Sequence, residues 1–265
     1  MTRRSALMSS DPNASRPRRF PATLSHLAPA GQPRRTAASP ALAAPRGVGM
    51  DSAAVRARMV QRLRAQGCAD DGVLQALDEV PRHLFVDTAL APQAYEDTSL
   101  PIGLGQTISK PSVVARMLEL LRVGRGGLPF KRVLEIGTGC GYQAAVLSLL
   151  ARQVFSVERL RPLHDKAREN LAPIRPAHLR LIYGDGRLGH PPNAPYDAII
   201  SAAGAEAVPA AWVDQLAPGG RLVAPALDAS GATQVLVVID RFEDGRIARS
   251  LYESVRFVPL ESGVD

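Results

Sequence analysis

From residue 132 onward, short apolar runs alternate with segments that carry apolar residues at helical spacing. Strands are predicted for RVLEI, QVFSVE, LRLIYG, YDAIIS and GRLVAPA, and helices for residues 142–151, 160–171 and 206–216. Such alternation is typical of a doubly wound, mostly parallel sheet that binds ligands at the carboxyl ends of its strands. Two later runs, TQVLVVIDRFEDG and IARSLYESVRFVPL, are predicted to form an antiparallel C-terminal hairpin turning at Asp244-Gly245. The pattern indicates an α/β fold.

The part of the chain before this alternation has a helical pattern. The first predicted helix presents Val55, Met59, Val60 and Leu63 on one face, and a second ends before Pro81, with Asp70 or Asp71 as its N-cap. Apolar residues at helical spacing also occur over 113–121. We therefore expect residues 51–131 to form an N-terminal helical subdomain and residues 132–265 to form the α/β domain.

The positive charge of the chain is concentrated at its beginning. The net charge is +7, and residues 1–50 contain eight arginines against a single acidic residue, Asp11. The other 215 residues are balanced, with 24 basic and 24 acidic side chains, so we expect no nucleic-acid partner. Residues 1–50 are rich in Arg, Pro, Ala and Ser, and this composition predicts a disordered extension. Met50 is an alternative initiator, and a polyanion-binding arm is a second interpretation of the extension.

The sequence VLEIGTGCGY, residues 133–142, indicates a nucleoside-binding site. Gly137, Gly139 and Gly141 allow a tight turn between a strand and a helix, and Glu158 ends the next strand, where a carboxylate accepts hydrogen bonds from ribose hydroxyls. The spacing G-x-G-x-G differs from the G-x-G-x-x-G of dinucleotide sites, and Glu135 would repel a pyrophosphate. S-adenosylmethionine carries no phosphate and has a cationic sulfonium. The motif therefore favours S-adenosylmethionine as the cofactor.

A third strand end carries Asp185 and Gly186, in the sequence GDG. Because parallel strands present their carboxyl ends on one edge, Asp185 is predicted to reach the same crevice and to accept from the adenine amino group. A plain turn role before glycine is the alternative. The histidines lack partners at metal-ligand spacing. The chain also has two cysteines, Cys68 and Cys140, which are too few for a metal cluster. That number favours a reducing cytoplasm, and no apolar run is long enough to span a membrane.

Several motifs together resemble the protein-L-isoaspartate O-methyltransferase family. They are AYEDTSLPIGLGQTISKPSVVARMLELL (94–121), VLEIGTGCGYQAAVLSLL (133–150), SVER (156–159), GDG (184–186), APYDAII (194–200), QLAPGGRLVAP (215–225) and VRFVPL (255–260). The resemblance covers nearly all of residues 51–265 and implies a Rossmann-like methyltransferase fold. LPIGxGQTIS is the most specific of these motifs. The chain departs from the family pattern at Ser201, Ala202 and Ala226, which affects neither the glycine motif nor QTIS.

The resemblance implies a function and a set of site residues. The activity is methyl transfer from S-adenosylmethionine to the free α-carboxylate of L-isoaspartyl residues in proteins and peptides, which starts their repair through a succinimide. Ser109 is then the active-site hydroxyl, and Thr107 and Ile108 line the cofactor pocket. From spacing alone, Ser109 is also a candidate N-cap for the helix that follows it, and both roles can coexist.

Two other functions stay open at this point. A relative that binds S-adenosylmethionine but methylates a different acceptor would share the glycine motif and Glu158. A relative without catalytic activity would share them too, and the changes at Ser201, Ala202 and Ala226 are compatible with such a protein. We expect a monomer, because damaged chains of any origin must reach the crevice.

Overall fold

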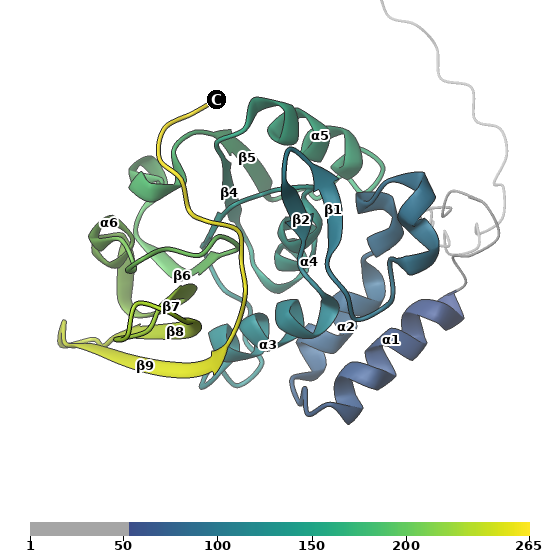
Figure 1. Ribbon diagram of the computed structural model, residues 1–265. Coiled ribbons are helices and arrows are strands. Elements are labelled where there is room, and N and C mark those ends of the chain that lie inside the picture. The colour runs from purple at the N-terminus through teal and green to yellow at the C-terminus, as the bar shows by residue number, and fades with distance from the viewer. Residues whose placement is uncertain (1–52) are drawn as a thin grey trace, which may run out of the picture. The chain divides into compact units, whose positions relative to one another are not determined.

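The computed structural model describes residues 53–265, so the predictions made for residues 1–50, including Met50, lie outside the described part. A seven-stranded sheet forms its centre, with strand order β5-β4-β3-β6-β7-β8-β9 (Figure 1). The strands are β3 (Val133–Ile136), β4 (Val154–Glu158), β5 (Leu179–Tyr183), β6 (Tyr196–Ser201), β7 (Leu216–Leu227), β8 (Gln234–Arg241) and β9 (Ile247–Ser254). The pairs among β5, β4, β3, β6 and β7 are parallel, and β7, β8 and β9 pair antiparallel. The predicted fold class is confirmed.

Helices cover the sheet and form the N-terminal part of the described chain. The α-helices are α1 (Ala53–Ala65), α2 (Asp71–Glu79), α3 (Pro111–Arg122), α4 (Tyr142–Leu150), α5 (Arg161–Leu171) and α6 (Ala210–Asp214). The short 3₁₀ helices are η1 (Arg82–Phe85), η2 (Thr88–Gln93), η3 (Gly186–Leu188) and η4 (Pro191–Asn193). Within residues 53–265, no helix is both long and apolar enough to cross a bilayer.

The central strands are apolar because helices cover both of their faces. Every residue of β3 and β4 is buried, including the polar side chains of Glu135, Ser156 and Glu158. Strands buried on both faces lose the alternation of apolar and polar residues and become nearly continuous apolar runs. This is why RVLEI and QVFSVE are recognisable as strands in the sequence.

The first helices share one hydrophobic core with the sheet. Met59 and Leu77, from α1 and α2, belong to the same buried cluster as Val133 of β3 and Val223 of β7. The predicted cap of α2 is Asp70, whose carboxylate accepts a hydrogen bond from the Val73 amide at 3.0 Å. The same carboxylate pairs with the buried Arg122 guanidinium at 2.8 Å and so joins the start of α2 to the end of α3.

One element of the N-terminal part was not predicted. Strands β1 (Leu100–Gly103) and β2 (Gln106–Ile108) form a two-stranded hairpin apart from the main sheet. Its turn residues Leu104 and Gly105 both have positive φ, of 52° and 70°. Two such residues are typical of a type I′ hairpin turn, for which Asn-Gly is the usual signal. Leucine at the first position does not give that signal, so the sequence did not predict this turn.

The end of the α/β part also differs from expectation in one place. The helix predicted at 206–216 is limited to α6, because Pro209 precedes its first residue and Leu216 already pairs with Tyr196 in the sheet. The C-terminal hairpin is confirmed, with β8 and β9 joined through Asp244 and Gly245. After β9 the chain turns back across the carboxyl ends of the parallel strands (Figure 1).

Candidate active site

The site lies where the strand order reverses direction. Strand β3 has β4 on one side and β6 on the other, so the connections leaving β3 and β6 run to opposite sides of the sheet. A crevice outside the carboxyl ends of the strands forms at such a point. The glycine loop follows β3 directly and leads into α4, whose N-cap is Gly141 with φ of 91°.

Glycine is required in this loop by both conformation and space. Gly139 has a φ of 54°, and a Cβ atom there would lie 3.2 Å from Cδ1 of Ile102 in β1. At Gly141 a Cβ atom would lie 3.1 Å from Cδ1 of Leu171. The loop therefore runs close to the β1–β2 hairpin on one side and to α5 on the other. Its bare backbone faces the crevice at Gly139.

Glu158 ends β4 beside this loop, and its side chain is 6% exposed. One carboxylate oxygen, Oε2, accepts from the Gly139 amide at 2.8 Å, and the other, Oε1, accepts from the Leu160 amide at 3.0 Å. A carboxylate oxygen has two lone pairs, so each oxygen retains capacity for a further donor. Glu158 therefore fixes the loop and still presents acceptors at the edge of the crevice.

Glu135 lies behind the loop, and its side chain has no exposed surface. Oε2 of Glu135 accepts from Ser156 Oγ at 2.5 Å, and Ser156 Oγ is 2.6 Å from Thr138 Oγ1. Burial raises the pKa of Glu135 from 4.5 to about 8, so its carboxyl group is protonated at neutral pH. The group therefore supports the loop from inside the sheet and does not line the cavity.

This burial predicts how stability depends on pH. The folded pKa of Glu135 is above its unfolded value, so the native state retains a proton that the unfolded chain releases between pH 4.5 and 8. The free energy of unfolding should fall across that window by at least about 1.4 kcal/mol, the equivalent of one pK unit. Glu135→Gln should remove that fall, as measured by urea unfolding at pH 5, 6.5 and 8. Glu169→Gln, at an exposed position, is the control and should retain it. An unchanged slope in Glu135→Gln would contradict a neutral buried acid.

One cavity brings together most of the predicted site residues. Its lining comes from the glycine loop, the ends of β4 and β6, the β1–β2 hairpin and the segment after β9. The predicted residues among its lining are Gly137, Gly139, Glu158, Gly186, Thr107, Ile108 and Ser109. Gly141 is not at the surface of the cavity and instead shapes the start of α4.

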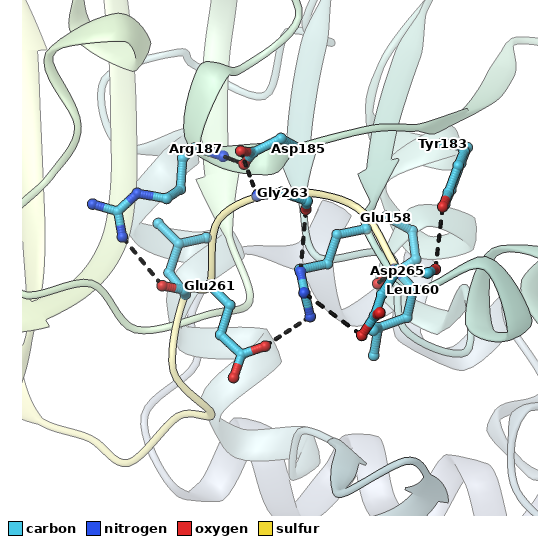
Figure 2. A network of polar contacts seen from close by, with 10 residues as sticks. Glu158, Leu160, Tyr183, Asp185, Arg187, Glu261, Gly263 and Asp265 are labelled. Atoms are coloured by element: carbon cyan, nitrogen blue, oxygen red, sulfur yellow. Dashed lines mark hydrogen bonds and ion pairs between the residues drawn. The ribbon is translucent and has the colours of Figure 1, made fainter.

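Asp185 is placed differently. Its Oδ1 accepts from the Arg187 amide at 2.8 Å and so caps η3, and its Oδ2 accepts from the Gly263 amide at 2.7 Å (Figure 2). The side chain of Asp185 does not line the cavity. The alternative turn role is thus present in the structure, and the adenine contact stays a prediction.

Ser109 lies between β2 and α3, but it does not cap the helix. The N-cap residue is Lys110, without a side-chain capping bond, so the N-cap role suggested for Ser109 is wrong. The helix is stabilised instead by Asp97, whose carboxylate accepts from the Ser112 amide at 2.8 Å. Within residues 53–265 the Ser109 hydroxyl makes no hydrogen bond, and it lines the cavity. It is therefore available to a ligand.

The part of the cavity wall formed by residues 258–261 was not predicted from the residues alone. Val258, Pro259, Leu260 and Glu261 line the cavity. The Leu260 amide donates to the Gly204 carbonyl at 2.7 Å, and the Arg159 guanidinium, next to Glu158, pairs with Glu261 at 2.7 Å. Figure 2 shows the chain continuing from Glu261 to Gly263, whose amide donates to Asp185, and on to Asp265. The only signal for it in the sequence is the VRFVPL motif of the resemblance.

The family model for protein-L-isoaspartate(D-aspartate) O-methyltransferase matches residues 54–265. The chain belongs to this family. It is 68% identical over 221 residues to the protein-L-isoaspartate O-methyltransferase of Methylibium petroleiphilum, covering 83% of this chain and 82% of the relative. The enzyme of the same name from Leptothrix cholodnii is 70% identical over 217 residues, covering 82% and 77% of the two chains.

Solved structures of the family agree with this assignment. One protein-L-isoaspartate O-methyltransferase superposes with a TM-score of 0.68 and 28% identity, covering 79% of this chain and 67% of its own. A second, a putative family member from Plasmodium falciparum in complex with S-adenosyl-L-homocysteine, gives 0.67 and 25% identity, with coverages of 78% and 98%. Membership in the family confirms the predicted activity and cofactor.

Proposed function

We propose that the crevice described above transfers the methyl group of S-adenosylmethionine to the α-carboxylate of L-isoaspartyl residues, with Ser109 orienting that carboxylate. The observation that supports this assignment is that the cofactor cavity and a neighbouring cleft share lining residues. The cofactor cavity adjoins a second cleft, of about 810 Å³, and four residues line both: Thr107, Ser109, Ala202 and Val258. A donor in the cavity and a peptide in the cleft would therefore meet at the Ser109 hydroxyl.

The cofactor cavity fits S-adenosylmethionine. Glu158 supplies free lone pairs for the ribose hydroxyls, and Gly139, with a positive φ, presents bare backbone to the cavity. Cys140, within the loop, is buried, and burial raises the pKa of its thiol to about 11, so a thiolate does not compete for the methyl group. The putative family member from Plasmodium falciparum was solved in complex with S-adenosyl-L-homocysteine, which supports the same cofactor class here.

The chemistry needs little from the acceptor side beyond alignment. When bound, S-adenosylmethionine supplies an activated methyl group on a sulfonium leaving group. The acceptor carboxylate is already ionised at neutral pH, so no general base has to remove a proton. Transfer of that methyl group from sulfur to one carboxylate oxygen would give a methyl ester and S-adenosylhomocysteine. The hydroxyl of Ser109 would donate to the other carboxylate oxygen and hold the first in line.

A direct test uses two peptides of the same sequence, one with an L-isoaspartyl and one with a normal aspartyl residue. With radiolabelled methyl donor, we expect base-labile label on the isoaspartyl peptide only, together with S-adenosylhomocysteine release. Label on neither peptide would support the alternatives of another acceptor or a binding protein without catalysis. Label on both would contradict the proposed acceptor.

The cleft beside Ser109 predicts a charge preference in the peptide. Its only charged lining residues are Lys110 and Arg256, and neither forms an ion pair within the described part of the chain. An isoaspartyl peptide with flanking acidic residues should have a KM about two- to fivefold lower than its neutral analogue, since an exposed charge pair contributes up to about 1 kcal/mol.

Arg256→Glu should reverse this preference, and added salt should weaken it. The matched control is Arg249→Glu on β9, which is equally a surface arginine but does not line the cleft. The measurement is steady-state KM for acidic, neutral and basic peptides. Equal KM values for the three peptides would contradict the prediction.

We propose a monomer in a reducing cytoplasm. Cys68 and Cys140 are both free thiols, which supports the compartment. Light scattering after size-exclusion chromatography would test the monomer, and a mass near 28.2 kDa is the expected result.

A further inference from the structure

A buried arginine contacts both halves of the active site without belonging to the cavity. Arg82 begins η1 and has no exposed surface. Its Nε donates to the Ala94 carbonyl at 2.7 Å, and its Nη2 donates to the Ser109 carbonyl at 2.8 Å. The guanidinium carbon lies 4.8 Å from the centre of the Tyr142 ring. Arg82 thus joins the segment of the catalytic serine to the first residue of α4, directly after the glycine loop.

This environment is unusual for a buried charge. Within residues 53–265 no carboxylate forms an ion pair with Arg82, and burial lowers the pKa of its guanidinium. Buried cations are normally paired with an acid, because desolvation of an unpaired charge costs several kcal/mol. Arg122 is the contrasting case, since its guanidinium pairs with Asp70. An arginine buried against two carbonyl groups and an aromatic ring, without a paired acid, is therefore not explained by its contribution to stability.

The position of Ser109 provides that reason. Among the described residues Arg82 is the one side chain that hydrogen-bonds to Ser109, and the Ser109 hydroxyl makes no bond of its own that would fix it. A displacement of about 1 Å in an orienting group lowers a rate by about 100-fold. The planar fork of arginine reaches two carbonyl oxygens at fixed directions, whereas lysine offers a single flexible donor group.

We propose that Arg82 is a positioning residue for methyl transfer, holding the main chain of Ser109 at a fixed distance from the glycine loop through Tyr142. It acts through Ser109 and does not touch the substrate or the cofactor. The inference rests on the orienting role proposed for Ser109.

The test is a double-mutant cycle of Arg82→Lys and Ser109→Ala, with kcat and KM measured for an isoaspartyl peptide. Activity is expressed per site that binds S-adenosylhomocysteine, which removes any contribution from unfolded protein. Arg82→Lys alone should lower kcat per site about tenfold, with S-adenosylhomocysteine affinity changed by less than about twofold. In the Ser109→Ala background the same substitution should change kcat by less than about twofold, because the group it positions is gone.

Arg122→Lys is the matched control for loss of a buried guanidinium. It should lower the melting temperature without changing kcat per site, because Arg122 lies at the end of α3 remote from Ser109. Arg82→Gln is the second variant, should Arg82→Lys retain too few binding sites to assay. Equal effects of the Arg82 substitution in both backgrounds, or an unchanged kcat per site, would overturn the proposal. An unaffected Ser109→Ala enzyme would instead refute the role of Ser109 itself.

Discussion

Ser109→Ala should lower kcat/KM for an isoaspartyl peptide by about 100-fold while leaving the affinity for S-adenosylhomocysteine unchanged. The hydroxyl lines both the cofactor cavity and the adjoining cleft, and within residues 53–265 it has no structural partner that the substitution would remove. Loss of the donor leaves the acceptor carboxylate free to rotate out of line. The helix should not be weakened, because Lys110 and not Ser109 is its N-cap residue.

The control for this prediction is Ser112→Ala, three residues further along the same segment. Ser112 lies in the first turn of α3 and does not line the cofactor cavity, so its substitution should leave kcat/KM within about twofold. Thermal unfolding should show similar melting temperatures for both variants. A rate for Ser109→Ala equal to that of Ser112→Ala would remove Ser109 from the mechanism.

Glu158→Ala should weaken binding of S-adenosylmethionine and S-adenosylhomocysteine by about 100-fold. Hydrogen bonds to a charged group contribute about 1.5–3 kcal/mol each, and a factor of 100 corresponds to about 2.8 kcal/mol. The substitution also frees the amides of Gly139 and Leu160, which Glu158 holds at 2.8 and 3.0 Å, so the loop loses its fixed position. Glu158→Gln retains the shape and one acceptor oxygen and should lose about tenfold.

Isothermal titration with S-adenosylhomocysteine measures both effects directly. Glu261→Ala is the matched control, because Glu261 is a second carboxylate on the cavity wall but is largely exposed and pairs with Arg159. Its loss should change affinity by less than about threefold. Equal losses for the two carboxylates would indicate that overall charge, rather than ribose recognition by Glu158, determines the affinity.

The sheet was predictable because burial on both faces leaves a strong signal. Strands β3 and β4 and helix α4 lie where the apolar runs and the glycines predicted them. The glycine loop, Glu158 and Gly186 also line one cavity, as predicted. These relations follow from parallel strands sharing a carboxyl edge. Ser109, Thr107 and Ile108 are different, because their place in the site was predicted from a family motif and not from any physical pattern.

What could not be predicted depends on contacts between distant segments. The prediction that Ser109 caps α3 was wrong. The side chain that accepts a hydrogen bond from an amide in the first turn is Asp97, fifteen residues upstream of its donor Ser112. The wall at residues 258–261 depends on pairing with Gly204 and Arg159, which no local pattern encodes. The same holds for Arg82, which in the sequence is an ordinary arginine after a proline and in the structure is buried against Ser109 and Tyr142.

The β1–β2 hairpin lies outside the seven-stranded sheet, yet it carries Ile102, Thr107 and Ile108 to the cavity. The cofactor cavity is therefore built from two separate sheets: the carboxyl ends of the parallel strands supply one wall, and the ribbon, whose Ile102 approaches Gly139, supplies another. Because Thr107 of the ribbon also lines the adjoining cleft, exchange of the ribbon between homologues should alter the cofactor cavity and the cleft together.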